Sequence, residues 1–142
     1  GRCIGICNFD AIKSPNDESA DILNKKMAEY AYAVVKDRPQ FHISLICDVS
    51  PNCDCHAEND APIVPNIGML ASFDMVALDK ACADLVNKQE VFKNSALGEN
   101  IEKHVEGHDH FHINHPDTNW ESQIEHGKKI GLGNDEYELI KF

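Results

Sequence analysis

The chain has 142 residues, of which 42% are hydrophobic, so it can build a single core and one compact domain. Its 13 basic and 24 acidic residues give a formal net charge of −11, which repels phosphate and anionic lipid and argues against nucleic acid or a membrane surface as a partner. The sequence shows neither an apolar stretch long enough for a membrane helix nor a secretory leader, and its six cysteines are too sparse for a disulfide scaffold, so we expect a cytoplasmic protein with reduced thiols.

The first residues carry two cysteines, Cys3 and Cys7, separated by three residues. This is the spacing of the last two thiolates in the bacterial ferredoxin run C-x2-C-x2-C-x3-C-P, which binds [4Fe–4S] clusters. The first two cysteines of such a run are absent, and Asn8 stands where the run has proline. We therefore expect residues 1–12 to be the remnant of a ferredoxin-like motif in a chain that begins inside a longer protein. Cys3 and Cys7 would bind a cluster in the intact protein but not in this chain alone, and the alternative is two ordinary cysteines near a terminus.

Residues 13–142 are predicted to form a separate α/β domain, which starts with a helix and a strand. Apolar side chains recur at helical spacing before Lys36. They are Leu23, Met27, Tyr30, Ala31 and Val34. Over residues 41–49 apolar side chains alternate with other residues, which predicts a strand with one apolar face. Cys47 lies on that face and is expected to be an inert core thiol.

A second strand and helix are predicted in the middle of the chain. The strand is short and buried, at about residues 67–71, and the helix runs from Met75 to Asn87 with Asp74 as its N-cap. The side chains expected on its buried stripe are Leu78, Ala81, Cys82 and Leu85.

The last third of the chain gives weaker patterns. We expect a helix over residues 97–105 and a histidine-rich loop after Gly107. A further helix, capped by Asp117 or Thr118, is predicted to end at Gly131 or Gly133 with Trp120 and Ile124 facing inward, and Tyr137 to Phe142 is predicted as a closing strand. The whole pattern predicts an α/β fold, a small sheet flanked by helices that is a fragment of a larger α/β domain. A second copy of the chain would cover its open sheet edge in a homo-oligomer.

A polar loop gathers soft and hard ligands in the middle of the sequence. Cys53, Cys55 and His56 lie within four residues, beside several carboxylates. Two thiolates and an imidazole suit a zinc or iron ion with a fourth ligand from elsewhere. The alternatives are a redox-active thiol pair and a structural loop whose aspartates bind backbone amides.

A second candidate metal site is the histidine-rich segment. Its imidazoles are those of His104, His108, His110, His112 and His115, beside Asp109. On a helix His104 and His108 would share a face, and on a strand His108, His110 and His112 would, so either geometry can bind a zinc or nickel ion. The alternative is a solvated loop that binds such ions opportunistically.

Two further stretches of sequence carry a family resemblance. Residues 48–55 read DVSPNCDC and residues 60–81 read DAPIVPNIGMLASFDMVALDKA. Together with the ending, residues 119–121, 130–133 and 137–139, they closely resemble the DUF362 family of uncharacterised iron–sulfur centre proteins. Members of that family typically carry a ferredoxin-like insert with two four-cysteine runs, and the opening of this chain is similar to the end of the second run. The histidine-rich segment departs from the resemblance.

The resemblance implies an iron–sulfur protein of undefined substrate. We expect the intact protein to transfer electrons between its [4Fe–4S] cluster and a site near the loop at residues 53–60, with a redox protein or a small molecule as partner. The alternative is a mononuclear metal-binding module or metal-dependent hydrolase centred on Cys53, Cys55 and His56.

Overall fold

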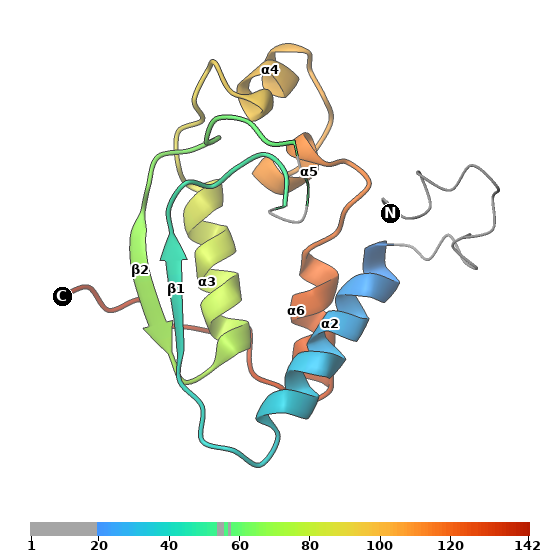
Figure 1. The fold of residues 1–142 in the computed structure, drawn as a ribbon, viewed down its shortest axis with the longest axis vertical. Helices are drawn as coiled ribbons and strands as arrows, with labels where there is room; N and C mark the ends of the chain where they lie inside the picture. Colours follow the sequence, from blue (N-terminus) through green and yellow to red (C-terminus); the bar gives the residue numbers. More distant parts are fainter. Residues whose placement is uncertain (1–19, 54–55, 57) are drawn as a thin grey trace.

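The computed structural model describes residues 20–53, 56 and 58–142. Its elements in chain order are α2 (Ala20–Val35), β1 (His42–Ile46), β2 (Gly68–Ser72), α3 (Met75–Asn87), α4 (Ala96–Glu102), α5 (His110–Asn114) and α6 (Glu121–Lys129). The predicted α/β class is confirmed, with a small sheet and flanking helices. Helix α3 packs on the sheet, α2 and α6 pack on each other beside α3, and α4 and α5 lie together at one end (Figure 1). Among the described residues, no helix is both long and apolar enough to span a bilayer.

The sheet consists of β1 and β2, which pair antiparallel from His42 opposite Ser72 to Ile46 opposite Gly68. The alternation predicted for the first strand is confirmed, and side chains of successive residues point to opposite faces. Ile46 is 5% exposed and lies in the core on the α3 side, whereas Ile43 and Leu45 are 60% and 67% exposed.

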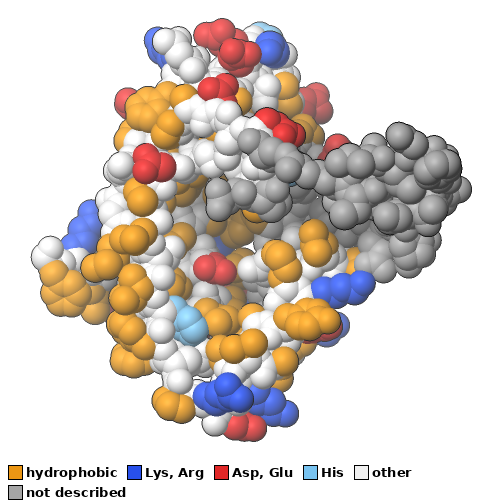
Figure 2. Space-filling view, viewed as in Figure 1, with side chains coloured by type: hydrophobic (Ala, Val, Ile, Leu, Met, Phe, Trp, Pro, Cys, Tyr) orange, Lys and Arg blue, Asp and Glu red, His pale blue; other side chains and the backbone are white. Residues whose placement is uncertain are grey.

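Two predictions about burial in the sheet are wrong. The strand at residues 67–71 exists as β2, but Met69 on it is 67% exposed, and Cys47, expected in the core, is exposed. The reason is that α3 packs on one face of the sheet, and within the described ranges no helix contacts the other face. Figure 2 shows the resulting row of apolar side chains along the strands.

Helix α2 confirms the first predicted helix. The face that it buries, however, is not the one that carries the large apolar side chains of the predicted stripe. Ala28 is 2% exposed and packs with residues of α3 and α6, whereas Leu23 and Tyr30 are 59% and 76% exposed. A small side chain at the contact lets the backbones of α2 and α6 come close together.

Helix α3 begins and ends as predicted. The Asp74 carboxylate accepts hydrogen bonds from the backbone N–H groups of Val76 and Ala77 at 2.9 and 3.0 Å, as an N-cap does. Of the stripe predicted for this helix, Leu78 and Ala81 are buried, and Cys82 and Leu85 are half-buried.

Two clusters of buried side chains connect these elements. The first, which joins the sheet, α3 and α4, comprises Ile46, Ile63, Val64, Val86 and Leu97. The second, which joins α2, α3 and α6, comprises Ala28, Val76, Ile124 and Leu132. Trp120 packs against the second cluster, so the prediction that Trp120 and Ile124 face inward is confirmed.

The C-terminal third differs from the predictions in three places. The segment after Gly107, predicted as loop, contains α5, whose N-cap is Asp109. Helix α6 receives no side-chain cap from Asp117 or Thr118, because the residue at its N-cap is Trp120. Residues 137–142 form no strand; instead the Tyr137 hydroxyl donates a hydrogen bond to Asp84 Oδ2 at 2.7 Å, which holds this tail against α3.

Candidate metal centre

Three side chains with metal-binding groups come together at the start of α5. They belong to His108, Asp109 and His112, and one potential ligand atom from each lies within 4.8 Å of the other two. Asp109 is the N-cap of the helix, so its carboxylate turns back over the first turn and meets His112, three residues later. The rings of His108 and His112 have their centroids 3.8 Å apart. The start of one short helix thus brings two imidazoles and a carboxylate together.

Hydrogen bonds from two other residues hold the Asp109 carboxylate of this cluster in place. Its Oδ1 accepts a hydrogen bond from the His112 backbone N–H at 2.8 Å and lies 2.9 Å from His112 Nδ1, and its Oδ2 accepts one from Trp120 Nε1 at 2.7 Å. Burial alone raises the pKa of Asp109, but the hydrogen bonds from His112 and Trp120 outweigh it and hold the pKa below its ordinary value. The carboxylate is therefore charged at neutral pH, although its side chain is only 9% exposed.

A second carboxylate borders the cluster from α6. Glu121 Oε2 lies 3.4 Å from His108 Nε2, which is itself 3.9 Å from Asp109 Oδ2. Ligand atoms around a tetrahedral zinc lie about 3.4 Å apart, so the group needs to contract by roughly an ångström to bind an ion. The side chains of His108 and Glu121 are 60% and 47% exposed, so their closer approach would not disturb the core.

The other histidines of the segment lie outside this group. His104 is exposed and has a φ of 56°, in the left-handed region. His110 Nε2 lies 3.0 Å from the Gln89 carbonyl oxygen, and His115 Nε2 lies 2.6 Å from that of Pro51. These two imidazoles hold α5 against the rest of the protein. Neither predicted grouping forms as such: His104 does not join His108, and His110 does not join His108 and His112.

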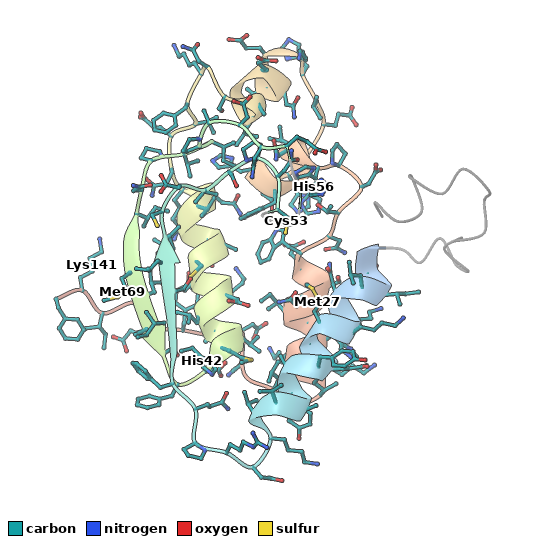
Figure 3. The ribbon with its side chains drawn as sticks, in the orientation of Figure 1. Met27, His42, Cys53, His56, Met69 and Lys141 are labelled. Carbon is teal, nitrogen blue, oxygen red and sulfur yellow. The ribbon has the colours of Figure 1, made fainter. Side chains whose placement is uncertain are left out.

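The loop with Cys53 lies next to the other end of α5. Asn114 and His115 both contact the Pro51 carbonyl oxygen, at 2.6 Å. Cys53 and His56 are exposed (Figure 3), and His56 Nδ1 lies 3.8 Å from Glu58. Cys55, like Cys3 and Cys7, lies outside the described residues. Within the described residues, no group of three metal-binding side chains contains a cysteine.

Sequence reasoning found the histidines of this centre but missed their partners. His108 and His112 are four residues apart, which is the spacing of one helical face, yet the segment was expected to be loop. Trp120 and Glu121 follow His112 by eight and nine positions, and no local pattern connects them to Asp109.

A family model described as a domain of unknown function (DUF362) matches residues 5–84. No curated protein matches the chain, and no solved structure matches it either. The matched segment contains α2, both strands, most of α3 and the loop with Cys53, whereas His108, Asp109 and His112 follow it in the chain.

Proposed function

The chain belongs to the DUF362 family, whose function is unknown, and from the chemistry of its own residues we propose that it binds one divalent metal ion at His108, Asp109 and His112. Two imidazoles and a carboxylate suit zinc and ferrous iron, and Glu121 supplies a fourth ligand. We take zinc as the reference ion, because four nitrogen and oxygen ligands complete its preferred coordination.

The observation that carries the proposal is the position of Asp109. Its carboxylate is charged, nearly buried and held by Trp120 beside two imidazoles. A helix N-cap alone accounts for the bond to the His112 amide. It does not account for His108, an exposed side chain that nevertheless lies between Asp109 and Glu121. A positively charged ion at this point neutralises the two carboxylates and links the starts of α5 and α6.

Titration of the 142-residue chain with Zn²⁺ is expected to show one site. Replacing both His108 and His112 by alanine is expected to weaken binding by at least about 100-fold, since losing a group that merely supports a ligand costs about 10- to 100-fold. Calorimetry measures the affinity. The fluorescence of Trp120, the single tryptophan, reports on the site itself because its indole binds Asp109. Binding should weaken as pH falls, because protons compete for the imidazole nitrogens.

The matched control is His104→Asn. It removes an exposed imidazole of the same segment that lies outside the cluster, and asparagine tolerates the left-handed backbone at this position. Unchanged zinc affinity in the His108, His112 double variant would refute the proposal. Loss of the site in a Cys53→Ser, Cys55→Ser double variant instead would favour the loop, which remains our alternative metal-binding or hydrolase site.

We propose a second role, in redox or electron transfer by the intact protein, because Cys3 and Cys7 have ferredoxin spacing. A [4Fe–4S] cluster takes four thiolates, and this run supplies two, so the chain alone does not complete the ligand set. When bound, such a cluster would supply one-electron chemistry. Its partner would be a redox protein or a small molecule.

Expression of the intact protein without oxygen tests this second role. Iron and sulfide in the purified protein, with a paramagnetic signal on reduction, are the expected results. An intact protein that never contains iron under these conditions would exclude the electron-transfer role and leave the zinc proposal unaffected, because the two sites share no residue.

A further inference from the structure

A cleft of about 290 Å³ opens between α2 on one side and β1 with α3 on the other. Figure 2 shows it as a hollow in this face of the molecule, with a histidine and an acidic side chain between apolar ones. Met27 of α2 and His42 of β1 come from its two walls (Figure 3). None of the proposed metal ligands, His108, Asp109, His112 and Glu121, lines this cleft.

The lining of the cleft combines apolar and polar residues with a single carboxylate among the described residues. Its apolar residues include Met27, Met75, Val76 and Ile124. The polar groups are those of His42, Ser44, Asp79 and Gln123, and no lysine or arginine of the described residues lines the cleft. An anionic ligand would therefore meet a carboxylate without a fixed positive charge to balance it.

Asp79 is the unusual residue of this lining. Asp79 lines the cleft and is exposed to water, and within the described part of the chain its carboxylate takes part in no hydrogen bond or ion pair. Burial raises the pKa of Asp79, and the nearby His42 lowers it only in part. A carboxylate that lines a cleft and has no partner in the protein is available to a ligand, and a shifted pKa at such a position is typical of binding sites.

We propose that the cleft binds a small organic cation, a primary ammonium on a short apolar body, with the ammonium against Asp79 and the body between Met27 and Met75. An ammonium gives the carboxylate the hydrogen bonds and the opposite charge that the protein does not provide. The apolar walls bury the body of the ligand, and a neutral apolar molecule of the same size would leave the carboxylate further desolvated.

The test uses n-butylammonium as the probe and n-butanol as its neutral counterpart. Each is added to the isotope-labelled 142-residue chain, and the amide signals of residues 42–44 and 75–79 are followed by NMR. Saturable shifts with n-butylammonium and none with n-butanol are expected. Asp79→Asn is expected to weaken binding by about tenfold or more, because it removes a charge-assisted hydrogen bond. Glu102→Gln makes the same change of charge at an exposed position of α4, outside the cleft, and should bind as the parent does.

Three results would overturn the proposal. They are equal shifts with n-butanol, unchanged affinity in Asp79→Asn, and no saturable shift at millimolar n-butylammonium. Asp79→Asn should fold as well as the parent, since asparagine has nearly the same shape and the exposed Asp79 makes no hydrogen bond or ion pair among the described residues, and circular dichroism checks this directly.

Discussion

Replacing Asp109 by alanine is expected to lower the free energy of unfolding by roughly 2–4 kcal/mol, the sum of a lost helix N-cap and a lost charged hydrogen-bond acceptor. The variant leaves the Trp120 indole N–H and the His112 amide without the oxygens that now accept from them. The cost is largest for Trp120, because a half-buried donor without an acceptor retains its full desolvation penalty. Urea denaturation measures the change, and Trp120 fluorescence follows the same transition.

Two further variants separate the roles of Asp109. Asp117→Ala removes an exposed carboxylate of the same region and should change stability by less than about 0.5 kcal/mol. Asp109→Asn keeps an oxygen acceptor for the helix cap and should lose less stability than alanine, while it still weakens zinc binding through the lost charge. A loss below about 1 kcal/mol in Asp109→Ala would mean that the carboxylate does not hold α5 and Trp120 in place.

Leu97→Ala should lower the free energy of unfolding by roughly 2–5 kcal/mol, the range for removing a large side chain from a packed core. Leu97 is 0% exposed and packs in the cluster with Ile46, Val64 and Val86. It attaches α4 to the sheet and α3, so the variant leaves a cavity among parts of the chain that are far apart in sequence. Denaturant unfolding measures the loss.

Ile101→Ala is the matched control on the same helix. Ile101 is 42% exposed, so truncating it should cost less than about 1 kcal/mol. Equal effects of the two substitutions would show that α4 does not depend on the buried cluster.

The parts of the fold that rest on local signals could be predicted from the sequence. Asp74 followed by an apolar helical pattern sets both ends of α3, because an N-cap acts within three residues. The alternation in β1 was likewise visible. The sequence did not show which face of β1 is buried. That depends on α3, which packs against Ser44 and Ile46 rather than against the larger side chains of Ile43 and Leu45.

The residue types of the candidate metal centre could be predicted from the sequence, but which of these residues lie together could not. The density of histidines marked the segment as a candidate site. However, His110 and His115 contact the backbone carbonyl oxygens of Gln89 and Pro51, which are 21 and 64 positions earlier in the chain. Trp120, which fixes Asp109, was predicted to face inward, yet its hydrogen bond is a property of how α5 meets α6. Helix α5 itself was missed because its five residues are too short for a periodic pattern to be recognised.

The uncovered face of the sheet has a consequence for the colloidal behaviour of this chain. Phe41, Met69 and Phe73 form an apolar strip there, and the rings of Phe41 and Phe73 contact each other at a tilt of 60° with their centroids 5.1 Å apart. Such a strip favours self-association, whereas a net charge of −11 keeps the molecules apart. Salt shortens the range of that repulsion to about 8 Å at physiological ionic strength and leaves the apolar attraction intact. Dilute buffers of low ionic strength should therefore keep the chain dispersed, and added salt should bring its molecules together.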